Sequence, residues 1–167
     1  MADATPDEIS ALIKRLGDPV AATRIDAAER LCRAGDAATS AVIALVNACG
    51  DDQPEVRDWA VAALEEIGPP PDGTTPELQA LIGRGGPLVA YWAITLLGRS
   101  GQAAATAVGT LTGCLTSASD PTVAQRAAWA LGKIGSPAAA PALREASQSA
   151  DPRLARLASE ALTAIGT

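Results

Sequence analysis

The chain has 167 residues, with 38 alanines, no histidine, no phenylalanine and a net charge of −6. Without histidine, there is no Ser-His-Asp or Cys-His catalytic pair and no zinc site of the HExxH kind. The scarcity of aromatic residues disfavours surfaces that stack nucleic-acid bases, and the acidic balance argues against binding nucleic acid or anionic membranes. The alanine content predicts closely packed helices, because alanine has the strongest helix propensity.

The first helix is expected near the start of the chain, at residues 5–17. Thr5 and Glu8 are spaced as in a capping box, and the apolar residues that follow recur at helical spacing. No apolar segment typical of a secretion signal precedes this helix. The longest apolar run, residues 88–94, is far shorter than the roughly 18 residues that cross a bilayer. We therefore expect no membrane insertion.

Three scattered cysteines, Cys32, Cys49 and Cys114, give no close pair of metal ligands. Their odd number and wide spacing fit free thiols in a reducing compartment better than a disulfide framework. The sequence therefore predicts a cytoplasmic protein.

Five segments of the chain repeat one helical pattern. All five copies open with Asp-Pro or Pro alone, and alanine and leucine follow six and ten residues after the proline in four of them. Aspartate is a good N-cap, proline suits the first helical turn, and glycine can close the helix in the left-handed conformation. The alanines and leucines lie on one stripe of the helix. The recurring leucines are Leu31, Leu64, Leu97, Leu131 and Leu162.

A second helix is expected after each of the first four copies. These helices are predicted at residues 38–49, 76–82, 103–115 and 137–147, each with aliphatic residues on one face. The helix at 76–82 is short because a connector with three successive prolines, residues 68–75, precedes it. No alternating β pattern competes, so the sequence predicts an all-α protein of about ten helices in antiparallel pairs.

The clearest copy, residues 120–135, reads Asp-Pro-Thr-Val-Ala-Gln-Arg-Ala-Ala-Trp-Ala-Leu-Gly-Lys-Ile-Gly. It resembles the short HEAT repeats of bacterial proteins, of the type found in phycobilisome lyases, and the resemblance extends over roughly residues 5–166. It implies a right-handed α-solenoid of about five HEAT-like antiparallel helix pairs in a single repeat domain, 1–167. The repeats are expected at 18–50, 51–84, 85–118, 119–149 and 150–167, after a capping helix at 5–17.

The outward face of the first helix in each repeat is one candidate surface for a partner protein. Positions one, four and eight after the proline point away from the predicted core. In the middle repeats, these positions and the flank of the same helices hold Leu88, Tyr91, Trp92 and Trp129. An exposed patch of this kind is typical of interaction sites. The alternative is that these side chains fold down between neighbouring helices.

The outward face of the second helices is another candidate surface, and the resemblance places it on the concave side of the solenoid. Its residues are small, polar and nearly uncharged, which suits a peptide or protein ligand and equally an ordinary solvated face. They are Ser40, Asn47, Gln79, Thr106, Gly109, Gly113, Thr116, Glu145 and Gln148.

Three other features have structural interpretations. Gly109 and Gly113 are four residues apart, which favours close packing of two helices. Acidic pairs such as Asp51 and Asp52 are interpreted as helix caps, so we expect no catalytic, cofactor or metal site. The last helix has no second helix after it, which leaves an apolar edge where two copies could associate, formed by Leu154, Leu157, Leu162 and Ile165.

These patterns predict a non-enzymatic scaffold or assembly subunit that binds a partner protein. The resemblance also suggests an enzymatic alternative, a lyase that attaches or detaches bilin chromophores, although no acid–base residue can be assigned to that reaction. A third possibility is a HEAT-fold DNA glycosylase, which the net charge of −6 contradicts.

Overall fold

The computed structural model describes residues 4–166, and the regular structure within this range is entirely helical. The all-α prediction is therefore confirmed for these residues. The α-helices of the first half are α1 (Pro6–Arg15), α2 (Ala21–Ala34), α3 (Val42–Ala48) and α4 (Pro54–Glu66). Those of the second half are α5 (Thr75–Ile82), α6 (Pro87–Arg99), α7 (Val108–Ser117), α8 (Pro121–Ile134), α9 (Ala140–Ala146) and α10 (Pro152–Ile165).

The chain divides into two compact units, Met1–Thr74 and Thr75–Thr167. The division falls at the end of the proline-rich connector that the sequence places at residues 68–75. The expected single repeat domain stays a prediction, and each unit is described by itself.

In the first unit, α2 packs against both α1 and α4, and α3 packs against α4. The predicted capping box of α1 is confirmed. The backbone N–H of Thr5 donates to Glu8 Oε2 at 2.8 Å, and the Glu8 N–H donates back to Thr5 Oγ1 at 3.3 Å. These bonds satisfy backbone donors that have no partner within the helix.

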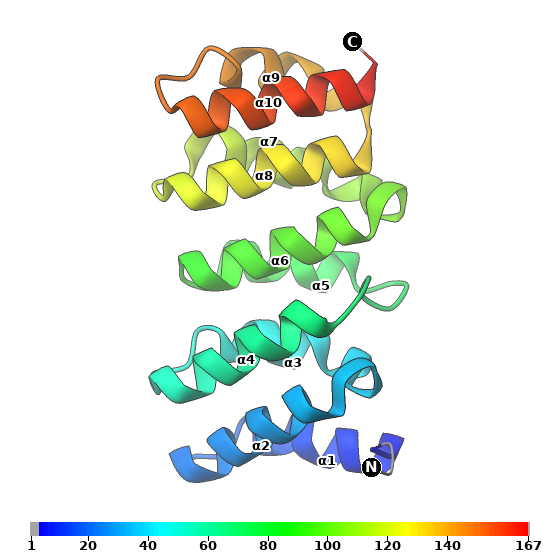
Figure 1. Cartoon of the computed structure of the whole chain (residues 1–167), viewed down its shortest axis with the longest axis vertical. Coiled ribbons are helices and arrows are strands. Elements are labelled where there is room, and N and C mark those ends of the chain that lie inside the picture. The colour runs from blue at the N-terminus through cyan, green and yellow to red at the C-terminus, as the bar shows by residue number, and fades with distance from the viewer. Residues whose placement is uncertain (1–3, 167) are drawn as a thin grey trace. The chain divides into compact units, whose positions relative to one another are not determined.

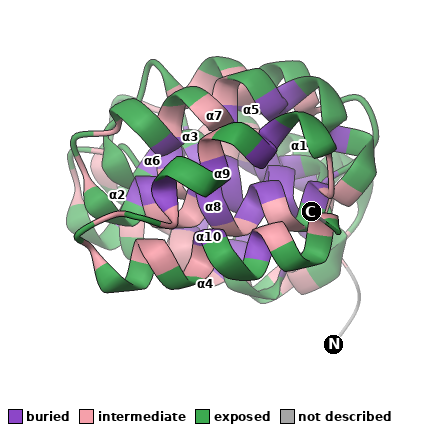
Figure 2. Ribbon diagram, turned by 90° about the horizontal axis from the view of Figure 1, so that it is seen from above, coloured by how far each residue is buried: buried purple, intermediate pink, exposed green. Residues whose placement is uncertain are grey.

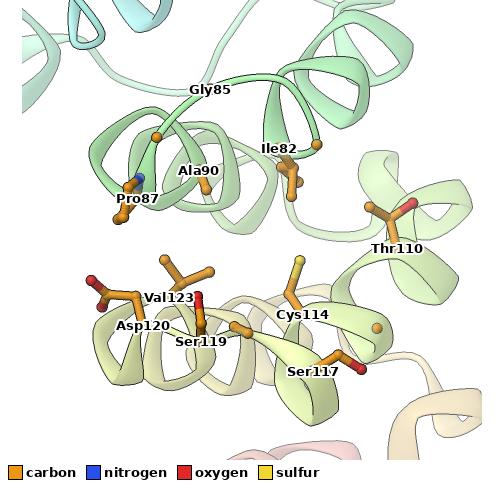
Figure 3. A pocket seen from close by; sticks show the side chains of 14 residues that line it. Ile82, Gly85, Pro87, Ala90, Thr110, Cys114, Ser117, Ser119, Asp120 and Val123 are labelled. Carbon is orange, nitrogen blue, oxygen red and sulfur yellow. The ribbon is translucent and has the colours of Figure 1, made fainter.

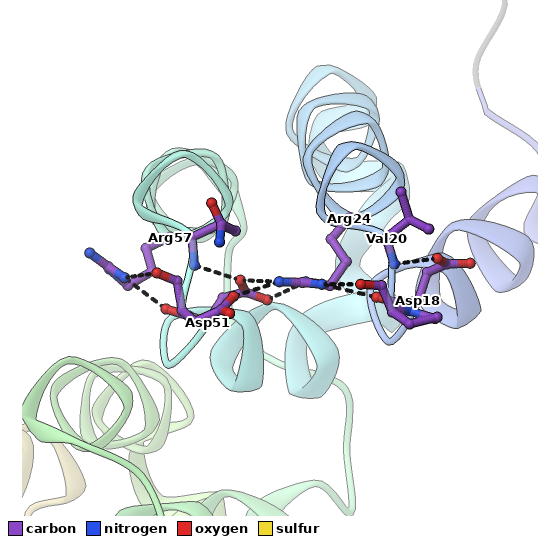
Figure 4. A network of polar contacts seen from close by, with 8 residues as sticks. Asp18, Val20, Arg24, Asp51 and Arg57 are labelled. Carbon is purple, nitrogen blue, oxygen red and sulfur yellow. Dashed lines mark hydrogen bonds and ion pairs between the residues drawn. The ribbon is translucent and has the colours of Figure 1, made fainter.

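In the first unit, an arginine on α2 binds two aspartates that precede α4 (Figure 4). Arg24 Nε and Nη2 donate to the two carboxylate oxygens of Asp51 at 2.7 and 2.9 Å, and Nη2 also pairs with Asp52 at 2.6 Å. Asp51 in turn accepts from the backbone N–H of Gln53 at 2.9 Å, at the start of α4. The predicted capping of α4 by Asp51 and Asp52 is wrong, because the N-cap is Gln53 and no side chain caps this helix. The two aspartates instead link the start of α4 to α2 through Arg24.

In the second unit, the helices form two layers (Figure 1). Helices α6, α8 and α10 lie side by side in one layer, with α5, α7 and α9 in the other. Buried residues gather between the layers (Figure 2), and the alanines of the repeat pattern contribute Ala93, Ala127 and Ala158. Such small residues let the helices approach closely. Leu131 is fully buried, whereas Leu162, at the same position of the last copy, is only half-buried.

The predicted helix ends are partly confirmed. Asp120 and Asp151 cap α8 and α10 by accepting backbone N–H bonds, and Gly135 and Gly166 close these helices in the left-handed conformation, with φ of 72° and 83°. Gly68 does not close α4 in this way. That helix ends at Glu66, and Ile67 is already extended as the chain enters the connector.

The second helices of three repeats begin differently from the prediction. The 3-10 segments η1 (Gly35–Ala41), η2 (Gly101–Ala107) and η3 (Pro137–Ala139) precede α3, α7 and α9. Side chains three residues apart eclipse in a 3-10 helix, and these segments consist mainly of alanine and other small residues that tolerate the crowding. None of the helices within residues 4–166 is long and apolar enough to cross a membrane.

Candidate protein-binding face

The layer formed by α6, α8 and α10 carries all four aromatic and aliphatic residues predicted to be exposed, and three of them are accessible. Leu88 is 37% exposed, and Tyr91 and Trp129 are half-buried. Tyr91 lies four residues after the proline of α6, and Trp129 lies eight residues after the proline of α8. The helical face inferred from the sequence therefore leads to these three side chains.

The predicted exposure of Trp92 is wrong, because its side chain is only 5% exposed. Trp92 occupies the fifth position after the proline of α6, on the flank of the predicted outward face. Its ring meets the Tyr91 ring edge-on, with centroids 5.7 Å apart, and the Arg99 guanidinium carbon lies 5.7 Å from its centroid. For this residue, the alternative of a side chain folded between neighbouring helices is correct.

Arg126 lies between the two half-buried aromatic rings, Tyr91 and Trp129. Its guanidinium carbon lies 4.2 Å from the centroid of the Tyr91 ring and 5.0 Å from that of Trp129. Arg126 and Trp129 are three residues apart on α8 and so share a face, whereas Tyr91 comes from α6. The negative faces of the two rings attract the guanidinium cation, and this attraction holds the guanidinium in place.

A hollow of about 330 Å³ lies beside these rings. We call it the Arg126 hollow, and it is lined by Tyr91, Gln125, Arg126, Trp129, Arg153 and Leu157, together with Thr122. A second hollow of about 250 Å³ adjoins it and shares Trp129 and Leu157. Its wall also includes the small residues Gly132, Ala161 and Ala164, with Lys133 and Glu160. Trp129 and Leu157 thus border both hollows.

The position of the Trp129 ring depends on close packing between helices. A Cβ atom on Gly98 would lie 2.4 Å from the Trp129 ring and 3.1 Å from the Ala130 Cα. A Cβ atom on Gly132 would lie 2.9 Å from the Cα of Ala161. Glycine at these two positions therefore lets α8 approach α6, and α10 approach α8.

The close packing predicted at Gly109 and Gly113 is wrong. Both glycines are exposed on α7, and a Cβ atom at either position would meet no other atom within 4 Å. Sequence spacing alone could not distinguish them from Gly98 and Gly132, because the difference depends on which helix face meets a neighbour.

A hydrogen bond fixes the end of the Arg126 hollow nearest the start of α10. Gln125 Nε2 donates to Asp151 Oδ2 at 2.7 Å, and this bond contributes most to holding the pKa of Asp151 below its ordinary value. The backbone amides of Arg153 and Leu154 donate to the other Asp151 oxygen. The start of α10, which carries Arg153, is thus anchored to α8.

The second candidate surface is also solvent-accessible. Gln79 is half-buried and donates to Thr110 Oγ1 at 2.9 Å, and the other eight residues of the predicted strip are exposed. Their binding role stays a prediction. The predicted apolar edge on α10 consists of half-buried side chains, and self-association through Leu154, Leu157, Leu162 and Ile165 likewise stays a prediction.

A groove of about 430 Å³ opens where α5 ends at Ile82 (Figure 3). It is mainly apolar, with Ile82, Pro87 and Ala90 on one side and Val123 of α8 and Cys114 of α7 on the other. Burial raises the pKa of the Cys114 thiol, so the thiol stays protonated at neutral pH. Burial also raises the pKa of Cys49, to about 12. Within residues 4–166, no group of three or more metal-ligating side chains lies together.

Charge is distributed unevenly along the chain. Residues 1–74 contain 6 basic and 14 acidic side chains, whereas residues 75–167 contain 7 basic and 5 acidic side chains. The unit that carries the Arg126 hollow is therefore net positive, although the whole chain is acidic. The net charge of −6 for the whole chain conceals this difference.

The family model for HEAT repeats matches residues 9–85 and 74–163. The chain belongs to the family of HEAT-repeat proteins, and the resemblance inferred from residues 120–135 is confirmed. No curated protein matches the sequence.

Solved structures with the same fold include a designed armadillo repeat protein in complex with the peptide (KR)4. It is 20% identical, the match covers 95% of this chain and 82% of that chain, and the TM-score is 0.69. The complex of CpcE and CpcF of phycocyanin lyase from Nostoc sp. PCC7120 is 21% identical over 99% of this chain and 66% of that chain, with a TM-score of 0.66. Human deoxyhypusine hydroxylase is 20% identical over 96% and 74%, with a TM-score of 0.55. These likenesses show the α-solenoid fold alone.

Proposed function

We propose that this chain is a non-enzymatic, cytoplasmic scaffold that binds a segment of a partner protein on the face formed by α6, α8 and α10. The observation that carries this proposal is the placement of Trp129 and Tyr91. Both rings are accessible on one face, and Trp129 borders two adjoining hollows that can receive side chains. Tryptophan, tyrosine and arginine are the residues that dominate binding energy at protein interfaces.

Two further observations support a binding role. Glycine at position 98 lets the Trp129 ring pack closely against α6, and a ring held in place in this way lowers the entropic cost of binding. The designed armadillo repeat protein of similar fold is in complex with a peptide. The thiols of Cys32, Cys49 and Cys114 all have raised pKa values owing to burial, which argues against a cysteine nucleophile.

The other functions suggested by the sequence have less support. The bilin-lyase alternative has a structural counterpart in the phycocyanin lyase complex, but that likeness concerns the fold. The DNA glycosylase alternative has less support because residues 1–74 are strongly acidic and the whole chain carries a net charge of −6. The strip on the second helices remains the alternative binding surface.

Selection from a library of displayed random peptides tests the proposal. We expect selected peptides to bind the full chain with an affinity that falls at least about 30-fold in the double variant Tyr91→Ser/Trp129→Ser, because even one central aromatic residue contributes roughly 2 kcal/mol at an interface. Fluorescence polarisation with labelled peptides measures the affinity. Trp129→Leu, which keeps an apolar contact over Gly98, should also weaken binding.

The matched control lies on the other layer of the same unit. The double variant Thr106→Glu/Thr116→Glu changes two exposed residues of the alternative surface and should leave the affinity unchanged. Circular dichroism confirms that each variant is folded. Peptides that lose binding in the Thr106→Glu/Thr116→Glu variant, but keep it in both Trp129 variants, would contradict the proposal and place the site on the second helices.

A further inference from the structure

Two arginines in the Arg126 hollow have no acidic partner. Among residues 4–166, neither Arg126 nor Arg153 forms an ion pair, and neither guanidinium donates a hydrogen bond. Arg24 in the first unit shows the contrast, because its guanidinium is fully engaged by Asp51, Asp52 and backbone carbonyl oxygens (Figure 4). The Arg126 hollow therefore presents unused cationic donors.

The environment of Arg126 favours an incoming anion. Its guanidinium is half-buried and held between the Tyr91 and Trp129 rings. Burial, together with repulsion from Arg153, lowers the pKa of Arg126. A negative charge placed between the two arginines would relieve this repulsion, and the interaction would be stronger in the partly desolvated hollow than in bulk water.

We propose that the Arg126 hollow binds a carboxylate side chain in an acidic segment of the partner protein, an inference that rests on the proposed function. A guanidinium offers two parallel N–H donors that match the two oxygens of a carboxylate. Here the ring stacking already fixes the orientation of one of the guanidinium groups. Aspartate and glutamate side chains of a protein partner supply such an acceptor at neutral pH.

The adjoining hollow indicates a second feature of the segment. Gly132, Leu157, Ala161 and Ala164 form the apolar part of its wall beside the Trp129 ring, and Lys133 and Glu160 form the polar part. An apolar side chain next to the carboxylate could fill this hollow. The segment therefore combines acidic and aliphatic residues, and the net positive charge of residues 75–167 favours its approach to this unit rather than to the acidic residues 1–74.

Two synthetic peptides test this inference. The first is a fluorescein-labelled ten-residue peptide of glutamate, leucine and serine, and the second replaces every glutamate by glutamine. At low salt, we expect the acidic peptide to bind the full chain at least about tenfold more tightly than the glutamine peptide, and added salt to weaken it. Arg126→Gln and Arg153→Gln should each lower the affinity for the acidic peptide about tenfold.

The control Arg144→Gln removes the same charge from an exposed position on α9, in the other layer. It should leave the affinity nearly unchanged, and an equal loss in all three variants would overturn the inference by showing a non-specific charge effect. Equal binding of both peptides, or binding of neither while library-selected peptides still bind, would overturn the preference for acid but leave the proposed function standing. If a labelled oligothymidine binds more tightly than the acidic peptide and loses this binding in Arg126→Gln, the hollow recognises phosphate and the inference is overturned.

Discussion

Replacing Leu131 by alanine is expected to lower the free energy of unfolding by about 3 kcal/mol, within the range measured for large-to-small changes in protein cores. Leu131 lies on α8 between the two layers of the second unit and is completely buried. Its truncation removes apolar contacts and leaves a cavity, because packed helices relax only partly. Urea unfolding followed by circular dichroism measures the loss.

Leu162→Ala is the matched control for this prediction. Leu162 occupies the same position in the last copy of the repeat pattern, but α10 leaves it half-buried. The same chemical change should therefore cost clearly less than at Leu131. Equal losses at the two positions would show that burial between the layers does not determine the contribution of this leucine.

Replacing Asp51 by asparagine is expected to lower the free energy of unfolding by about 1.5 kcal/mol at pH 7, the size typical of a hydrogen bond to a charged group. Burial raises the pKa of Asp51, but the bonds from Arg24 and the Gln53 amide outweigh this effect and leave the pKa below its ordinary value. The charged form is therefore stabilised by folding. Urea unfolding at a series of pH values measures the difference between the two proteins.

The pH dependence of this difference has a definite sign. A carboxylate whose pKa is lowered by folding contributes its stability above the unfolded pKa of about 3.9 and loses it as the pH falls through the folded value. The gap between Asp51→Asn and the unaltered chain should therefore close below pH 4. Asp52→Asn, which alters a largely exposed partner of Arg24, should have a much smaller effect at pH 7. A gap for Asp51→Asn that stays constant between pH 7 and pH 2 would contradict the assigned ion pair.

The sequence was sufficient to predict the helical repeats and most of their buried positions. Proline, alanine, leucine and glycine recur at intervals that encode the start, the packed stripe and the end of a helix, so Ala127, Leu131 and Gly135 are found where this periodicity places them. The 3-10 starts of three second helices were missed, because the small residues of these segments are compatible with both helical forms.

The candidate face was only partly predictable. The rule that the first, fourth and eighth residues after the proline point outward leads to Tyr91 and Trp129. It also includes Arg153, the first residue after the proline of α10. The rule does not lead to Arg126. This residue is the fifth after the proline of α8, and the buried Trp92 is the fifth after the proline of α6. Whether a flank position is covered depends on the spacing and side-chain size of the neighbouring helix, and the repeat pattern does not specify these.

Fluorine NMR of the chain labelled with 5-fluorotryptophan tests the central claim most directly. The three tryptophans occupy different places, with Trp59 on α4 of the first unit, Trp92 buried in α6, and Trp129 on the proposed binding face. Each signal is assigned from the corresponding Trp→Phe variant. On titration with a peptide selected from the library, the Trp129 signal should shift most and the Trp59 signal should stay in place. A saturating peptide that leaves Trp129 unmoved would contradict the account.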